Sequence, residues 1–275
     1  MFKAAINAEL LKDAIASLAV IVDEVRFKIK PEGISVKAVD PPTLQWGGFL
    51  SLGSSAFEEY SADECEIGID LNKITDLLGI ADRNDTVRME LDEGSNKLLI
   101  DVGGLSYTLS LLDPSTIRAE PRVPQLELPA KVVLNGADLR RAVKAAEKIS
   151  DHMLMGVSGD TFYMEAKGDT DQVRLEMGRD QLIDLKAGEA CSLFSLDYLT
   201  DIVKPTNKVN EVTLSLGRDF PPILIDFEIA NGAQNLLPAG SENRIGLRMT
   251  CRQKNLHITH SLQKRLPTLE IWEFP

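Results

Sequence analysis

Residues 113–129 read DPSTIRAEPRVPQLELP and contain four prolines. Proline lacks an amide donor and has a fixed φ angle, so a run this dense cannot form a helix or a central strand. The stretch is therefore predicted to be an extended, semi-rigid connector. A simple linker between unrelated domains has the same composition. The sequences on its two sides resemble each other, which favours a connector between two copies of one duplicated domain.

Segment 3–40 aligns without a gap to segment 131–168 when 128 is added to each number. A second block, 71–102, aligns to 196–227 with an offset of 125. Matches in the same order on both sides of the connector indicate an internal repeat of about 125 residues, too long for a solenoid unit, so each copy is predicted to be a domain. Chance similarity between two amphipathic patterns is the alternative.

Composition is typical of a soluble globular protein, with 44% apolar and 26% charged residues among 275. No apolar run approaches 18 residues and the first residues do not resemble a signal peptide, so we expect no membrane partner and a cytoplasmic protein. Three cysteines without CxxC spacing favour a reducing compartment over disulfides or zinc. We expect no metal and no cofactor.

The pattern of each copy predicts two helices and a majority of antiparallel strands, an α+β fold with the helices on one sheet face. Helices are expected at 8–22, 71–80, 137–149 and from 196 to just before Pro205, with Asp70 and Ser195 as N-caps. The predicted organisation is a first domain at 1–112, a connector at 113–129, a second domain at 130–235 and a divergent tail at 236–275.

The formal charge of −12 taken alone argues against nucleic acid. Arg140, Lys144 and Lys148, however, are spaced to stack along one side of a helix. The other cations on or beside the predicted helices are Lys12, Lys73, Arg83, Arg141, Lys204 and Lys208. Evenly spread cations without aromatic residues between them suit contacts with phosphates, which carry no sequence information. A solvated helix face is the alternative.

Several long segments resemble the DNA polymerase sliding clamps of the proliferating cell nuclear antigen family, archaeal members above all. They are MFKAAINAELLKDAI, GISVKAVDPP, GLSYTLSLLDPSTIR, SDHMLMGV, EAKGDTDQVRLEM, SLFSLDYLTDIVK and FPPILIDFEIANGA, which together span residues 1 to about 234. The resemblance implies a homotrimeric ring of six similar domains that encircles double-stranded DNA without reading its sequence. The twelve helices of such a ring line its hole.

The resemblance also implies how subunits and partners attach. An edge strand of the first domain would pair with an edge strand of the second domain in the next subunit, which involves Tyr107, Leu109, Leu111, Arg174, Leu175 and Met177. DNA polymerase, the clamp loader (replication factor C), a flap endonuclease and DNA ligase would dock in a groove. Matching groove positions are Val39, Asp40, Thr43, Leu126, Leu128 and Pro222. Leu126 and Leu128 could instead be half-buried connector residues.

The end of the chain departs from the family, whose members have a strand reading like YLLAPRI near the carboxyl end. Here only Leu236-Leu237-Pro238 echoes it, and residues 236–275 carry six basic and three acidic residues. A reading-frame change that compromises the last strand is one hypothesis, and a genuine extension is the other. His257 and His260 lie in this tail, too isolated for a metal site.

No nucleophile, base and orienting residue recur as a set, and no GxxxxGK[ST] motif is present. We therefore predict a non-enzymatic processivity factor. An interaction scaffold that never encircles DNA is one alternative. A metal-dependent hydrolase using Asp169 and Asp171 is another, although two such carboxylates more often form a turn.

Overall fold

The structure is a computed structural model of the whole chain. It describes residues 1–39, 46–117, 128–204, 206, 209–217, 224–228 and 246–251. Five of the predicted site residues, Asp40, Thr43, Leu126, Lys208 and Pro222, lie outside the described residues. So do Leu236-Leu237-Pro238 and both tail histidines.

Among its described residues, the first half of the chain forms two helices and nine strands. In chain order these elements and one 3-10 turn are β1 (Phe2–Asn7), α1 (Ala8–Ala19), β2 (Glu24–Lys30), β3 (Gly33–Val39), β4 (Trp46–Gly53), η1 (Ser54–Ala56), β5 (Glu59–Ala62), β6 (Cys65–Asp70), α2 (Leu71–Ile80), β7 (Thr86–Asp92), β8 (Lys97–Val102) and β9 (Leu105–Ser110). The predicted α+β character is confirmed for this half.

The second half repeats the same order. Its elements are β10 (Ala130–Leu134), α3 (Gly136–Ala146), β11 (His152–Ser158), β12 (Thr161–Lys167), β13 (Gln172–Gly178), β14 (Asp184–Lys186), β15 (Ala190–Ser195), α4 (Leu196–Ile202), β16 (Val212–Leu216), β17 (Leu224–Glu228) and β18 (Gly246–Cys251). The sequence pattern did not predict the short strands β5 and β14.

Strand register confirms the internal repeat residue by residue. In the first half Ile6 of β1 lies opposite Val87 of β7. In the second half Leu134 of β10 lies opposite Val212 of β16, which are the same two positions shifted by 128 and 125. The pairs β2–β6 and β11–β15 repeat in the same way. The two copies therefore share their hydrogen-bond ladders as well as their pattern of apolar residues.

All described strand pairs are antiparallel and fall into three sheets. Their orders are β5-β1-β7-β8-β9, then β14-β10-β16-β17-β18-β4-β3-β2-β6, and β13-β12-β11-β15. The nine-stranded sheet crosses from one half to the other through the pairing of β18 with β4. β9 and β13 are consequently left as edge strands, one in each half.

β18 occupies the place beside β17 that β9 occupies beside β8. A frame change was expected to compromise this last strand, yet the divergent tail supplies it. The strand lies further along the chain than the repeat predicts, because an offset of 125 would place it at 230–235.

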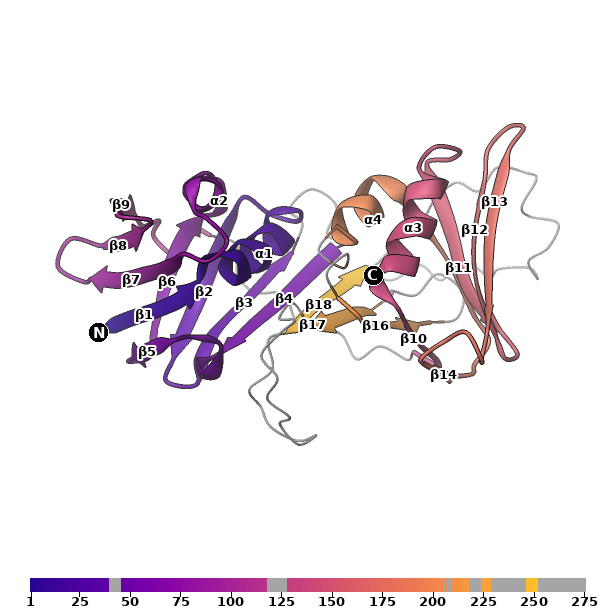
Figure 1. Ribbon diagram of the computed structural model, residues 1–275, viewed down its shortest axis with the longest axis horizontal. Coiled ribbons are helices and arrows are strands. Elements are labelled where there is room, and N and C mark those ends of the chain that lie inside the picture. The colour runs from indigo at the N-terminus through magenta and orange to yellow at the C-terminus, as the bar shows by residue number, and fades with distance from the viewer. Residues whose placement is uncertain are drawn as a thin grey trace, which may run out of the picture.

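The helices pack in pairs, α1 against α2 and α3 against α4, and both pairs lie on the same side of the molecule (Figure 1). Each helix buries one apolar stripe; in α3 this stripe consists of Leu139, Ala142, Val143 and Ala146 beside Gly136. Three helices begin at a side-chain cap, at Asn7, Asp70 and Asn135. The Asp70 cap is as predicted, whereas Ser195 makes no side-chain cap bond.

The start of the connector differs from the extended conformation that its prolines predict. Residues 114–116 form a turn, in which the Asp113 carboxylate accepts the Ser115 amide at 2.8 Å. The Arg26 guanidinium donates to the Ile117 carbonyl, and the Ile117 side chain is buried. The connector is therefore anchored to the first half before it continues beyond the described residues.

Close packing at Gly136 generates a stability prediction. A Cβ atom at Gly136 would lie 2.3 Å from the Thr206 carbonyl oxygen and 2.6 Å from that of Val209. We expect Gly136→Ala to lower the free energy of unfolding by about 1–3 kcal/mol, because the backbone must shift. Gly79→Ala is the matched control, since nothing lies within 4 Å of its added Cβ and alanine favours helix by about 1 kcal/mol. Thermal unfolding at fixed protein concentration compares them, and equal effects would contradict the prediction.

Candidate nucleic-acid interface

The exposed side of α3 carries the densest group of cations among the described helices. The Arg140 guanidinium donates through Nη1 to the Lys204 carbonyl at 2.8 Å, which ties α3 to the end of α4. Arg141 Nη2 lies 2.9 Å from Asp138 Oδ1 one turn earlier. Lys144 is exposed in the last turn of the helix. The predicted basic stripe is therefore present on α3.

Lys148 extends this stripe from a different position than predicted. α3 ends at Ala146, so Lys148 lies in the turn beyond the helix. Its Nζ is 2.8 Å from Glu147 Oε1. The hydrogen bond from Lys148, together with the charge of Lys144, lowers the pKa of the Glu147 carboxyl. This carboxylate stays ionised at neutral pH and offsets part of the positive charge there.

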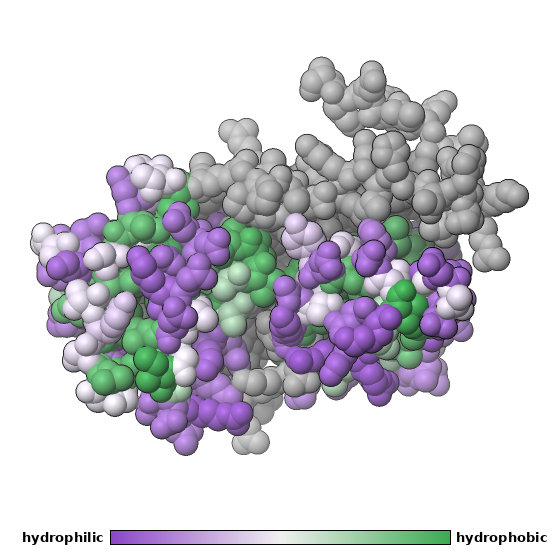
Figure 2. All heavy atoms as spheres, turned by 90° about the horizontal axis from the view of Figure 1, so that it is seen from above, coloured by the Kyte–Doolittle hydropathy of each residue, from purple (hydrophilic) through white to green (hydrophobic). Residues whose placement is uncertain are grey.

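α4 contributes little net positive charge. Its first turn carries Asp197, and Lys204 just beyond its end forms an ion pair with Asp201. Seen from above in Figure 2, hydrophilic residues gather over the half that carries α3 and α4, while the other half shows a mixture of hydrophilic and apolar residues.

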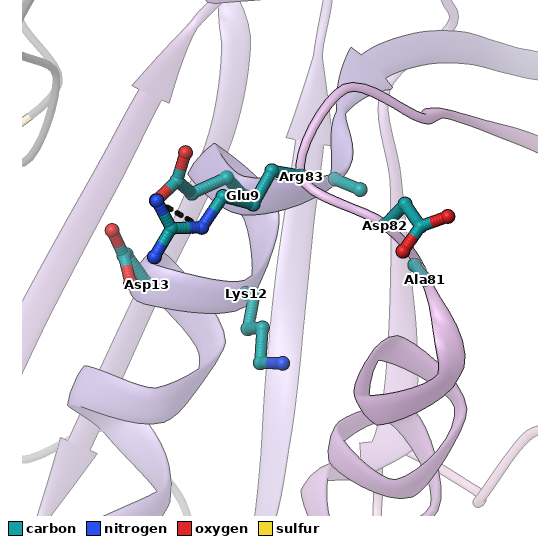
Figure 3. A pocket seen from close by; sticks show the side chains of 7 residues that line it. Glu9, Lys12, Asp13, Ala81, Asp82 and Arg83 are labelled. Carbon is teal, nitrogen blue, oxygen red and sulfur yellow. Dashed lines mark ion pairs between the residues drawn. The ribbon is translucent and has the colours of Figure 1, made fainter.

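Two cations on or beside the first-half helices, Lys73 and Arg83, lie near acidic groups. Lys73 Nζ lies 3.4 Å from Asp70 Oδ2, and Arg83 Nε lies 3.9 Å from Glu9 Oε1. Figure 3 shows Arg83 reaching from the loop after α2 across the start of α1 to Glu9, while Lys12 points elsewhere. A hollow of about 190 Å³ lies between the start of α1 and the loop after α2, and it is lined by Ala8, Glu9, Lys12, Asp13, Ala81, Asp82 and Arg83.

The edge strand β9 exposes apolar side chains. Tyr107 is 41% exposed and Leu105 is 50% exposed, and sequence reasoning did not single out Leu105. Leu109 and Leu111, in contrast, are buried in the core of their own half. Of the three predicted interface side chains here, only Tyr107 is open to solvent.

On the edge strand β13 the side chains alternate between the two sheet faces. Met177 is buried, Leu175 is partly buried, and Arg174 faces the other side. The Arg174 guanidinium lies 4.7 Å from the Tyr163 ring centroid and pairs with Glu165 and, at 2.6 Å, with Glu176. Arg174 is therefore held by its own chain.

Only part of the predicted partner groove falls within the described residues. The backbone of Val39 ends β3, and Leu128 is half-buried just before β10, which agrees with either reading of that residue. Asp169 and Asp171 lie in the turn between β12 and β13, where the Gly168 amide donates to the Asp171 carbonyl. Within the described ranges no cluster of three His, Cys, Asp or Glu side chains is placed to hold a metal ion. No helix there is long and apolar enough to cross a membrane.

Two family models match the two halves. Residues 1–102 match the N-terminal domain of proliferating cell nuclear antigen, and residues 122–239 match its C-terminal domain. The chain belongs to the proliferating cell nuclear antigen family. Residues 240–275 lie outside the matched region.

Relatives in this family are close. The DNA polymerase sliding clamp of Methanosarcina mazei is 96% identical over 233 residues, which cover 85% of this chain and 94% of the relative. That of Methanococcoides burtonii is 64% identical over 232 residues, which cover 84% and 94%. At this similarity the chain is a sliding clamp, as its resemblance to the family predicts.

Solved clamp structures match almost the whole fold. A. fulgidus PCNA, solved with the C-terminal region of FEN-1 bound, has a TM-score of 0.84 and 31% identity, with 94% of this chain and 100% of that chain covered. PCNA of Thermococcus kodakaraensis has a TM-score of 0.79 and 25% identity, with 92% and 99% covered.

The buried carboxylate of this clamp generates a pH prediction. Glu165 is 8% exposed; burial alone would raise the pKa of its carboxyl, but Lys167 and Arg174 outweigh burial and lower it. A carboxyl whose pKa is lower in the folded than in the unfolded state stabilises the folded protein at every pH above the unfolded-state pKa, which is about 4.3 for glutamate. This stabilisation is lost as the pH falls through the lower, folded-state pKa.

We expect Glu165→Gln to cost about 1–2 kcal/mol at pH 7, and the cost should shrink as the pH falls through the lowered pKa of the Glu165 carboxyl, because the wild-type carboxyl then becomes protonated. Glu176→Gln is the control, because that side chain is 56% exposed and exposed ion pairs contribute little. Thermal unfolding across this pH range measures both. A cost that does not change with pH would contradict the assignment.

Proposed function

We propose that three copies of this chain close head to tail into a ring that encircles duplex DNA and tethers replication and repair enzymes to it. The observation that carries the proposal is the pair of edge strands, β9 and β13. Inside the chain their counterparts β18 and β4 are paired with each other, and that pairing joins the two halves. The same kind of pairing between chains would join β13 in the second half of one chain to β9 in the first half of its neighbour.

The internal junction supplies the register of the proposed interface. Tyr107 lies opposite Ile100 as Met249 lies opposite Ile225, so Tyr107 and Met249 are equivalent. Leu50 and Leu175 are equivalent too, because Leu50 lies opposite Val36 of β3 and Leu175 lies opposite Met164, the aligned residue of β12.

Within the chain Met249 lies opposite Gly48, and Leu247 lies opposite Leu50. Transferring this register places Tyr107 opposite Val173 of the next subunit, and Leu105 opposite Leu175.

This register brings apolar side chains together. Leu105 and Tyr107 share a sheet face with the buried Leu109, since they alternate along β9. Val173 and Leu175 share a face with the buried Met177. The proposed pairing therefore continues the core of one subunit into the next, and covers the exposed parts of Leu105 and Tyr107. A contact in which different surfaces meet is heterologous, and it produces a ring when its rotation closes.

Three copies give a hole of suitable size. Twelve helices with neighbours roughly 10 Å apart form a circle of about 120 Å, or roughly 38 Å between opposite helix axes. Subtracting a helix diameter of about 10 Å leaves room for a hydrated duplex. The exposed sides of the helices, with the cations of α3, would face the DNA.

We propose that such a ring acts without catalysis. It would work as a processivity factor because a closed ring cannot leave DNA sideways. Tethered partners would be DNA polymerase, the clamp loader, a flap endonuclease and DNA ligase, in the cytoplasm where the chromosome of an archaeal cell lies. The FEN-1 segment bound to A. fulgidus PCNA supports this kind of tethering.

Subunit closure is tested by Tyr107→Ala. Loss of a central aromatic residue from a small interface typically costs about 2–4 kcal/mol, so each contact should weaken roughly 30- to 1000-fold. We expect light scattering to give three times the 30.3 kDa chain mass for the wild type and the mass of a single chain for the variant at micromolar concentration. Leu99→Ala is the control, because Leu99 is 39% exposed but lies on β8, away from the edge.

Encirclement is tested on circular DNA. Wild-type protein loaded by its clamp loader should remain on nicked circles through a high-salt wash, and should leave once the circles are linearised. Gel filtration of the DNA fraction measures both. Equal loss from circles and linear DNA would favour the scaffold that never encircles DNA.

A further inference from the structure

We infer that phosphate contact is concentrated on the second domain of each chain, along α3 and the turn after it, and that the helix face of the first domain contributes little. This inference rests on the proposed ring. Of the six domains around the hole, the three second domains would contact the phosphates of the duplex, and the three first domains would contact them little. The occupant is the phosphate backbone of duplex DNA, because the contacting groups are exposed cations without an aromatic platform.

The internal repeat makes the asymmetry visible position by position. α1 and α3 occupy equivalent places, so their exposed residues can be compared directly. The aligned pairs, first domain first, are Glu9 and Ala137, Lys12 and Arg140, Asp13 and Arg141, Ala16 and Lys144, and Val20 and Lys148. In four of these five pairs the second-domain residue is more positive, and in the remaining pair both are cations. In two further pairs, Leu10 with Asp138 and Ala19 with Glu147, the second-domain residue is the acidic one, so the cations of α3 outnumber but do not exclude acids there. The two helices therefore occupy equivalent positions in their domains, but α3 carries more cations than α1.

Cations beside the first-domain helices also form ion pairs. The Arg83 guanidinium turns back to Glu9, at the rim of a hollow that Asp13 and Asp82 also line (Figure 3). Lys73 is paired with Asp70. Lys73 and Arg83 therefore lie near carboxylates, as Arg141 and Lys148 do in the second domain, and the Arg83 side chain is 83% exposed, so ion pairing leaves the difference in charge as it stands.

On α3 the charges are better placed for a phosphate. Arg140 is fixed by a neutral partner, the Lys204 carbonyl, so it keeps its whole positive charge in a defined position. Lys144 has no ion pair with any described residue. Arg141 and Lys148 pair with acids on their own segment, but both side chains are more than 70% exposed, and pairs this exposed hold weakly.

α4 does not extend the cationic sector. Asp197 and Asp201 outnumber Lys204 among its charged residues, and Lys204 is paired with Asp201. The positive surface is thus one helix wide in each chain, and three such stripes would be spaced around the hole.

Salt-dependent binding to a short linear duplex tests the inference. Each phosphate contact that releases a counterion contributes about 0.9 to the slope of log K against log salt concentration. Arg140→Ala with Lys144→Ala should weaken binding of the ring at least tenfold and lower the slope by about 2. Lys12→Ala with Lys73→Ala should weaken it less than threefold. Equal losses for the two double variants would overturn the inference.

A gain of binding provides the converse test. Asp13→Arg with Ala16→Lys copies two α3 charges onto α1, and it should tighten binding to the same duplex about tenfold. Unchanged affinity would count against electrostatic control by this face. Lys30→Ala with Lys186→Ala removes two exposed strand lysines and is the control for net charge, expected to leave affinity within twofold. Light scattering and circular dichroism verify that every variant is a folded ring.

Failure of the inference is distinguishable from failure of the ring. The Arg140→Ala, Lys144→Ala ring should still remain on nicked circles, because its retention there is topological. If the wild type itself is lost from nicked circles, the ring proposal fails. If the wild type is retained and both double variants bind short duplex equally well, only the asymmetry fails.

Discussion

Backbone pairing between β18 and β4 is the interaction on which the architecture depends. It converts two separate domains into one body through main-chain hydrogen bonds, which do not depend on the identity of the side chains. The same pairing leaves β9 and β13 with one unpaired row of amides and carbonyls each. An open edge strand is a template for another chain, and here the two edges are complementary by the symmetry of the repeat. The duplication thus produces one strand pairing inside the chain, between β18 and β4, and leaves the equivalent strands β9 and β13 unpaired.

Sequence alone predicted much of this architecture, because the repeat constrains two domains at once. Apolar spacing and the candidate caps Asp70 and Ser195 together located the four described helices, and constant offsets predicted which strands are equivalent. Residues with little pattern of their own were missed. EYSA and DLK, the residues of β5 and β14, are only four and three residues long, too short for a recognisable alternation, and they pair with the edges of β1 and β10. β18 lies outside the constant offset, so no alignment of the two copies could place it.

The candidate site was less predictable than the fold, because charge depends on which residues meet. The sequence supplies a count of cations, whereas the structure shows how many are already engaged. Arg83 and Glu9 are 74 positions apart, and their contact follows from the packing of α2 against α1. Arg140 and Lys204 are likewise brought together by the packing of α3 against α4. Spacing within one helix predicted the stripe on α3, since that arrangement is local, but it could not show that Arg83 reaches Glu9 or that the Lys204 carbonyl holds Arg140.

In the proposed ring these cations would not need to bind DNA tightly. A protein that relied on phosphate contacts for retention would need many of them, and its affinity would fall steeply with salt. A closed ring retains DNA by connectivity, so its contacts need only centre the duplex. Fewer contacts also allow movement, because each step along the helix breaks and remakes only those few. An acidic chain with a net charge of −12 and one narrow cationic helix face per subunit fits that requirement better than a uniformly basic lining would.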